Sequence, residues 1–190
     1  MRKLLRNLHL ACALSLLTCA GTASAEFKFR DGECTDGART GRAAGLLGEC
    51  GDVSTRLIEK SRLDGAKLDG IDMSDATLRA SNWKNVSLRG MRGGKLLVAR
   101  VTWSHTDATG ADFRGARFGN VDCDACDFRG ADLRAVRMVG GRFRADFRGA
   151  DLRESFIENV VFIGSDFRGA KLGGKFWALN RFEDCKFDAD

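Results

Sequence analysis

Large apolar residues recur every five positions along most of this chain. These residues, called centres here, keep one phase from Leu63 to Phe143 and a second phase from Phe147 to Phe187. A small residue, often alanine, lies two positions before each centre, and the residue between them is usually polar. A period of five fits neither an amphipathic helix, with its period of about 3.6, nor a plain strand, with its period of about 2.

The pattern predicts a chain that turns every five residues. If the centre and the small residue point inward, four such sides close a square coil of about 20 residues. Successive coils would stack through backbone hydrogen bonds about 4.8 Å apart, so residues 61–190 would form about six and a half coils and a rod roughly 30 Å long. Each coil can bury its core only against its neighbours, which is why several coils are needed for stability.

Residues one coil apart should form columns inside this rod. Two columns of centres are rich in aromatic residues and are interpreted as an interior ladder rather than as a ligand site. They are Leu63, Trp83, Trp103, Cys123, Phe143, Phe162 and Phe182, and Leu68, Leu88, Ala108, Phe128, Phe147, Phe167 and Phe187.

A four-residue motif, Asp-Phe-Arg-Gly, occurs at 112–115, 127–130, 146–149 and 166–169. The repeat Ala-Asp-Phe/Leu-Arg-Gly resembles the pentapeptide-repeat family over about residues 61–190. This resemblance implies an all-β fold, a right-handed quadrilateral β-helix (β-solenoid), and the handedness rests on the resemblance alone.

The repeat is irregular at two places. Phe147 follows Phe143 by four positions instead of five, so one residue is missing there. Gly93 occupies a centre within the glycine-rich segment 90–95, but the spacing and the following Leu96 do not match a phosphate-binding loop. We therefore expect a loosened coil at Gly93 and no nucleotide site.

The N-terminus is typical of an exported protein. Basic residues in 1–6, a short apolar run at 11–17 and the sequence Ala23-Ser24-Ala25 predict a signal peptide cleaved after Ala25. The apolar run is too short for a membrane anchor, and Thr18 is a poor fit for a lipoprotein modified at Cys19. A periplasmic or secreted location is expected, with no stable membrane insertion after cleavage.

Removing this leader lowers the formal net charge from +5 to +2, because it takes away three basic residues and no acidic ones. Such a charge requires neither a nucleic acid nor an anionic membrane as partner. The predicted organisation is a signal peptide (1–25), a small disulfide-linked N-terminal cap (26–60) and the repeat solenoid (61–190).

Five cysteines remain after residue 25, and export permits disulfide bonds between them. Cys34 and Cys50 precede the repeats, in a segment too short to hold a core alone. We predict a bridge between them, worth roughly 3 kcal/mol in the chain-entropy model. The odd number of cysteines leaves at least one unpaired within a monomer.

Cys123 and Cys126 form a C-x-x-C motif with three interpretations. Cys123 is a centre and Cys126 an inward small position, which favours two buried thiols. A local disulfide across the corner is the alternative, since the ends of a tight turn lie within about 7 Å. A redox or zinc site is disfavoured, because no helix start lowers a thiol pKa and Cys185 would lie roughly 14 Å from Cys126. His105 is expected at a solvated corner, and no cofactor or metal is predicted.

Two columns of arginines are expected on the outside of the rod, each beside a column of aspartates that relieves its self-repulsion. The arginines are Arg129, Arg148 and Arg168 in one column, and Arg114, Arg134 and Arg153 in the other. Such exposed pairs favour solubility and edge specificity. The alternative is an interaction face for an anion or polymer, built from regularly spaced guanidinium groups.

Outward positions late in the chain become apolar: Phe156, Val161, Ile163 and Phe176. With no capping helix after Phe187, an open coil edge with an apolar rim favours association. We expect a two-fold homodimer through the last coils, and the resemblance supports it, since family members often dimerise at this end. The alternative is that these residues only pack on one another.

The sequence favours an exported, non-catalytic scaffold that binds a protein or an envelope polymer. One alternative is a DNA mimic protecting a topoisomerase, but the family's DNA mimics are acidic and cytoplasmic, unlike this chain. Another is a thiol–disulfide enzyme using Cys123 and Cys126. An enzyme is disfavoured, because no acid–base pair converges and a filled rod has no cleft.

Overall fold

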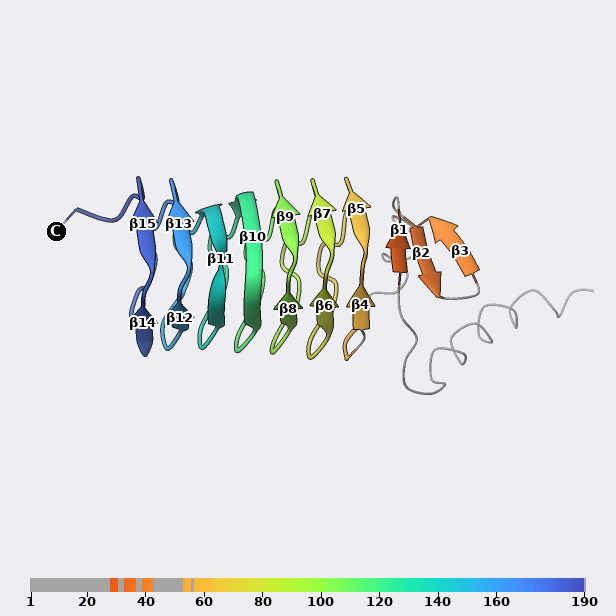
Figure 1. Cartoon of the computed structure of the whole chain (residues 1–190), viewed down its shortest axis with the longest axis horizontal. Coiled ribbons are helices and arrows are strands. Elements are labelled where there is room, and N and C mark those ends of the chain that lie inside the picture. Colours follow the sequence, from red (N-terminus) through yellow and green to blue (C-terminus); the bar gives the residue numbers. More distant parts are fainter. Residues whose placement is uncertain (1–27, 31–32, 37–38, 43–52, 56, 190) are drawn as a thin grey trace, which may run out of the picture.

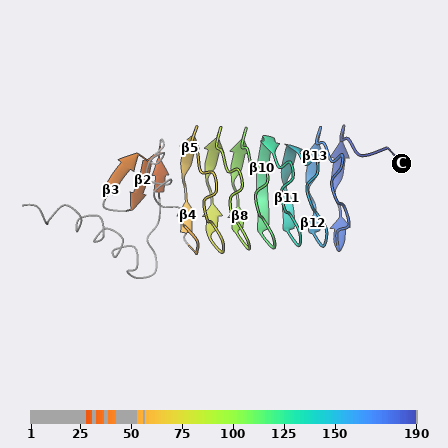
Figure 2. The ribbon, with the colours of Figure 1, turned by 180° about the vertical axis from the view of Figure 1, so that it is seen from behind.

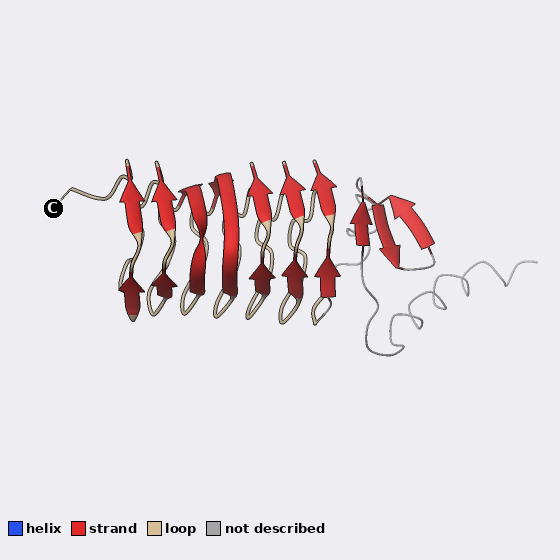
Figure 3. Ribbon diagram, viewed as in Figure 1, coloured by secondary structure: helices blue, strands red, loops and turns tan. Residues whose placement is uncertain are grey.

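The computed structural model describes residues 28–30, 33–36, 39–42, 53–55 and 57–189, with side chains in the last two ranges. These residues form strands, turns and bends, and the all-β prediction is confirmed (Figure 3). None of the described segments is a helix capable of crossing a membrane.

Most of the described chain is a stack of coils with two columns of short parallel strands (Figures 1 and 2). The first column contains β4 (Leu57–Glu59), β6 (Thr77–Arg79), β8 (Leu97–Ala99), the start of β10 (Arg117–Asp127) and of β11 (Arg137–Asp146), β12 (Phe156–Glu158) and β14 (Phe176–Ala178). The second contains β5 (Arg62–Asp64), β7 (Asn82–Lys84), β9 (Thr102–Ser104), the later parts of β10 and β11, β13 (Val161–Ile163) and β15 (Arg181–Glu183).

The register shows the predicted coil length. Leu57 pairs with Thr77, 20 residues further on, and Arg137 pairs with Phe156, 19 residues further on, after the missing residue. Single bridges such as Lys67 to Ser87 connect the coils on the other two sides. The predicted β-solenoid of about six and a half coils is therefore confirmed.

Most five-residue sides end at a corner residue in the left-handed region. Gly65, Asn85 and His105, for example, have φ values of 69°, 54° and 52°. Glycine and asparagine adopt this conformation most readily, while other residues there are held by the stack: the N–H of His105 donates to the carbonyl of Asp124 at 2.8 Å. His105 is therefore the corner residue that the repeat predicts.

The centres and small inward residues form one continuous core. Phe147 is fully buried and stacks between Phe128 and Phe167, with ring centroids 5.2 and 4.9 Å away. In the other aromatic column, Trp83 and Trp103 stack with centroids 6.3 Å apart. Both interior ladders are confirmed.

The missing residue is a corner. Asp124 pairs with Arg144 and Cys126 with Ala145, so Ala125 has no counterpart in the next coil. Phe143 on one side of the shortened corner remains fully buried, as does Phe147 on the other.

The shortened coil also brings two backbones together at Gly141. Its φ is 96°, and a Cβ built there would lie 2.1 Å from the carbonyl oxygen of Val121. Glycine is required at this position, because the neighbouring atoms are backbone and cannot move aside cheaply.

The coil at Gly93 is packed, so the expectation of a loosened coil is wrong. The side chain of Met91 occupies the space, with its Cε 2.6 Å from where a Cβ of Gly93 would lie. The N–H of Gly93 donates to the carbonyl of Asp112 at 2.7 Å, as the repeat requires. A flexible neighbour has filled the volume of the absent side chain.

An antiparallel sheet precedes the coils and consists of β1 (Lys28–Arg30), β2 (Glu33–Asp36) and β3 (Arg39–Arg42). Strand β1 lies beside β4 and β5 of the first coil (Figure 1). Because β4 belongs to the coil stack, the stack begins before residue 61. The leader 1–25 and Cys50 lie outside the described residues, and the Cys34–Cys50 bridge stays a prediction.

Candidate functional site

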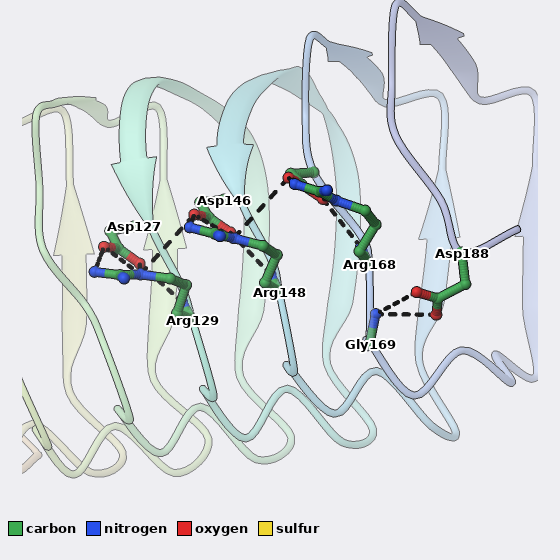
Figure 4. A network of polar contacts seen from close by, with 8 residues as sticks. Asp127, Arg129, Asp146, Arg148, Arg168, Gly169 and Asp188 are labelled. Atoms are coloured by element: carbon green, nitrogen blue, oxygen red, sulfur yellow. Dashed lines mark hydrogen bonds and ion pairs between the residues drawn. The ribbon is translucent and has the colours of Figure 1, made fainter.

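The two sides of the rod that carry the Asp/Arg columns are called the ladder faces. On the first, Figure 4 shows Arg148 clamped onto Asp146 of its own repeat. Nη2 lies 2.6 Å and Nε 2.9 Å from Oδ2 of Asp146, and the backbone N–H of Arg148 donates to Oδ1 at 3.0 Å. Arg129 on Asp127 and Arg168 on Asp166 have the same arrangement.

Longer contacts connect one clamp to the next. Nε of Arg129 lies 3.9 Å from Oδ2 of Asp146, and Nε of Arg148 lies 3.9 Å from Oδ2 of Asp166. The network ends in the last coil, where Asp188 accepts a hydrogen bond from the N–H of Gly169 (Figure 4). Each interior arginine therefore lies between two carboxylates.

The second ladder face repeats this geometry. Arg114, Arg134 and Arg153 lie 2.6 Å from Asp112, Asp132 and Asp151 respectively. The contact from Arg114 to Asp132 of the next coil is 3.8 Å.

The ladders hold their carboxylates in the charged form. Hydrogen bonds from the Arg153 side chain, followed by its backbone N–H, lower the pKa of Asp151 to about 2. Arg168 lowers the pKa of Asp166 to about 2 in the same way. The pKa of Arg134 is raised by its bond to Asp132. Five of the six predicted arginines are exposed and Arg134 is half-buried. All six are already paired, so their free donors are fewer than the sequence suggests.

Cys123 and Cys126 are joined by a disulfide across the corner at Ala125, with Cα atoms 5.9 Å apart. Both residues are buried, as their register positions predict. The structure therefore has the local bridge, which was the alternative, rather than two separate thiols.

Cys185 is a free, partly buried thiol whose S–H donates to the carbonyl of Glu183 at 3.4 Å. Burial raises its pKa, so it is a poor nucleophile at neutral pH. Within 53–55 and 57–189, no group of His, Cys, Asp and Glu side chains is placed to hold a metal ion.

The four predicted rim residues do not lie together on one surface. Phe156 and Phe176 stack on each other with centroids 4.6 Å apart, which is the alternative to association. Val161 and Ile163 are half-buried on β13, a strand of the other column. Of these four described residues, only Phe176, at 44% exposure, is exposed rather than half-buried.

The sequence predicted an open coil edge but placed its apolar rim on other residues than those exposed at the open end of the last coil. Leu179 there is a corner residue with a φ of 57°, a repeat position that is also exposed at Asn159 and Asp184. Three centres are exposed because no described coil lies beyond them: Leu172, Phe182 and Phe187. The signal that could have identified them is position in the stack, since the same repeat positions are buried elsewhere.

The sequence also did not indicate the outer side of the first strand column, called the strand face here. Parallel pairing places Leu97, Arg117, Arg137, Phe156 and Phe176 in one outward row. The guanidinium carbon of Arg137 lies 4.0 Å from the ring centroid of Phe156. Neither Arg117 nor Arg137 forms an ion pair with any residue that the structure describes.

The family profile named Pentapeptide repeats matches residues 104–134 and 143–174 in eight copies. The repeats of this chain therefore belong to the pentapeptide-repeat family, and the resemblance recognised in its sequence is confirmed. Among curated protein sequences, none matches this chain significantly.

Several solved pentapeptide-repeat structures resemble the fold. Rfr23 of the cyanobacterium Cyanothece 51142 is 13% identical over 76% of this chain and 92% of its own, with a TM-score of 0.33. QnrB1, described as a plasmid-mediated fluoroquinolone resistance protein, is 15% identical over 72% and 91%, with a TM-score of 0.33. HetL of Nostoc sp. strain PCC 7120, involved in heterocyst differentiation regulation, is 15% identical over 76% and 93%, with a TM-score of 0.20. Similarities this distant say nothing about what this chain binds.

Proposed function

We propose that this protein is an exported, non-catalytic scaffold that binds a protein or an envelope polymer through its outer faces. The observation that carries the proposal is the combination of a filled core with long, chemically ordered faces. Phe147 and its neighbours fill the interior, so recognition falls to the surface, where charged and apolar side chains repeat at a fixed spacing of about 4.8 Å.

The thiol and carboxylate groups that could take part in catalysis are bonded, buried or paired with other residues. Cys123 and Cys126 are bonded to each other, and Cys185 is partly buried with a raised pKa. Aspartates such as Asp146 and Asp166 are held by arginines. These observations support binding rather than catalysis, and they give no support to a thiol–disulfide enzyme.

Paired ladders also argue against a DNA mimic. A surface that imitates DNA must present negative charge, whereas each aspartate in the motif repeats lies against an arginine of its own repeat. The resulting faces are close to neutral, which weakens any long-range attraction to a DNA-binding enzyme.

Export rests on the leader pattern of residues 1–25 and is supported by the Cys123–Cys126 disulfide, since such bonds persist in oxidising compartments. Cell fractionation followed by N-terminal sequencing tests it. We expect the protein in the periplasm or medium, starting at Glu26. A cytoplasmic protein that retains Met1 would remove this part of the proposal.

The scaffold function is tested by affinity capture from envelope extracts with the mature protein. A variant carrying Arg129→Glu, Arg148→Glu and Arg168→Glu tests the first ladder face, because it places three carboxylates beside the existing aspartates. Loss of a captured partner assigns binding to that ladder. An unchanged partner assigns it to another surface, and no specific partner with any form of the protein contradicts the scaffold function.

Self-association through the last coil is part of the proposal. Phe182 and Phe187 are 40% and 43% exposed at the open end, where a two-fold contact would bury them against a second copy. Sedimentation should show a dimer at tens of micromolar, and Phe182→Lys should yield a monomer, because a charge would be buried in the contact. A wild-type monomer at that concentration excludes the dimer.

A further inference from the structure

The strand face differs from the ladder faces in how its cations are placed. Arg117 and Arg137 are direct partners on adjacent parallel strands, so two like charges stand one coil apart. Both side chains are exposed, and neither has a carboxylate partner among residues 53–55 and 57–189. By contrast, Arg148 on a ladder face is clamped by Asp146 at 2.6 Å. A like-charged pair without a counter-charge is unfavourable in isolation and is relieved when an anion binds.

Apolar side chains flank this pair along the same row. Leu97 lies one coil before Arg117 and is 38% exposed. Phe156 lies one coil after Arg137 and stacks under its guanidinium. Arginines and aromatic residues are the side chains enriched at the energetic centres of protein interfaces.

Gly119 leaves the surface open beside Arg117. It lies inside β10, between Ala99 and Val139 of the neighbouring strands. A Cβ at Gly119 would meet only the carbonyl oxygen of Val98 at 4.0 Å, and its φ is not left-handed. The fold therefore does not require glycine here, and a glycine inside a strand often marks close approach by another backbone.

We propose that the strand face binds a short, extended, acidic segment of another protein, with its carboxylates on Arg117 and Arg137. This proposal rests on the scaffold function and names its binding surface and ligand. The backbone of the segment lies beside Gly119, and its apolar side chains contact Leu97 and Val139. Arginine suits this role because its planar donors bind a carboxylate in a bidentate manner.

The dimensions of the face fit one chain. A three-residue strand is about 10 Å across, and six coil steps of about 4.8 Å give a strip about 29 Å long, the length of roughly nine extended residues. Such a strip buries less than the roughly 800 Å² per partner of a stable globular interface. A single segment therefore fits better than a folded partner lying flat on this face.

Two other anionic ligands fit less well. A sugar polymer would stack on exposed ring faces, but one face of Phe156 lies against Arg137 and the other against Phe176. A broad anionic membrane would meet Glu59 and Glu158, which lie on the same face on either side of the arginine pair. A segment can place its carboxylates on the arginine pair and uncharged residues opposite Glu59 and Glu158, which a uniformly anionic surface cannot do.

The test uses a fluorescent nonapeptide that alternates glutamate and valine, and a matched peptide with glutamine for glutamate. Binding to the purified protein is followed by fluorescence anisotropy. We expect saturable, salt-sensitive binding of the glutamate peptide and at least about tenfold weaker binding of the glutamine peptide, since each charge-assisted bond is worth more than 1 kcal/mol.

Variants locate the site. Arg117→Gln with Arg137→Gln should weaken binding at least about tenfold, while the matched pair Arg129→Gln with Arg148→Gln on the ladder face should not change it. Gly119→Leu keeps both arginines and tests the open surface, and it should weaken binding by a similar factor. Circular dichroism confirms that each variant is folded.

Several results would overturn the inference: no binding, equal binding of both peptides, or an equal loss in the ladder variant. Tighter binding of polygalacturonate, or of phosphatidylglycerol vesicles, that depends on Arg117 and Arg137 would assign the face to a different ligand. If the strand-face variant keeps a partner captured from envelope extracts and the ladder variant loses it, the scaffold function stands and this inference fails.

Discussion

The interior coils and the last coil have the same repeat but different surroundings. Phe167 is 1% exposed and Phe187, at the equivalent position one coil later, is 43% exposed. Their rings stack at 5.2 Å, so both occupy the same column. The difference shows that burial in a solenoid depends on having a coil on each side and cannot be assigned to a repeat by itself.

The charged columns change at the same boundary. Lys171 follows Asp151 and Lys186 follows Asp166, so a lysine replaces the aspartate of both ladders in the last coil. Asp188, two residues after Lys186, occupies the position that arginine holds in the preceding repeats. The end of the rod is therefore chemically distinct from its middle, which suits a surface that does not continue the stack.

The largest expected contrast lies in the core. Phe147→Ala should lower the free energy of unfolding by about 3–5 kcal/mol, because it opens a cavity between two stacked rings. Phe187→Ala should cost about 1 kcal/mol, since much of that side chain already contacts solvent. Urea unfolding measures both. Equal losses would mean that the last coil is covered, as it would be in a dimer, and the comparison should then be repeated at low protein concentration.

A glycine in the interior coils should tolerate substitution by alanine only where there is room for the added Cβ. Gly141→Ala is expected to cost about 2–3 kcal/mol, because its Cβ would collide with the backbone of Val121. Gly119→Ala, one coil earlier in a strand with free space, should change stability by less than about 0.5 kcal/mol or raise it slightly. A neutral Gly141→Ala would show that the shortened coil can shift without cost.

The Asp/Arg columns of the ladder faces should also make the free energy of unfolding depend on pH. Asp151 and Asp166 have folded pKa values of about 2, below the ordinary value of about 3.9. Their stabilisation is therefore present above about pH 4 and lost as pH falls toward 2.

Substituting both aspartates by asparagine should cost about 1 kcal/mol or less per site at pH 7, because the pairs are partly exposed. The difference from wild type should vanish near pH 2. Urea titrations at several pH values measure it, and a difference that persists at pH 2 would mean that charge is not its source.

The smallest expected effect is at the end of the ladder. Asp188→Asn keeps an acceptor for the exposed N–H of Gly169 and should change stability by less than about 0.5 kcal/mol. The same substitution, Asp146→Asn, removes a carboxylate that contacts two arginines and should cost more. Thermal unfolding of the two variants side by side distinguishes them, and the reverse order would show that the last coil is held by its polar contacts.

The fold could be predicted from the sequence because the spacing of the repeat determines which residues point inward and where the chain turns. Inward and outward positions from Leu63 to Phe167 follow from the five-residue period, and the Asp/Arg columns follow from the coil length. The strength of the ladder clamps could not be predicted, since it depends on the side-chain geometry of Arg148 and its equivalents. The fit at Gly93 could not be predicted either, because a neighbouring methionine fills the space there.

The sequence by itself determined the coil, its register, the interior aromatic columns and the position of the shortened corner, because each is a local consequence of spacing. Only the tertiary structure decided which charges are free. Stacking places each ladder arginine within reach of its own aspartate and the next, whereas it places Arg117 against Arg137 with no acid opposite. It also decided that Phe182 and Phe187 are exposed, because burial requires a neighbouring coil that the repeat alone does not specify.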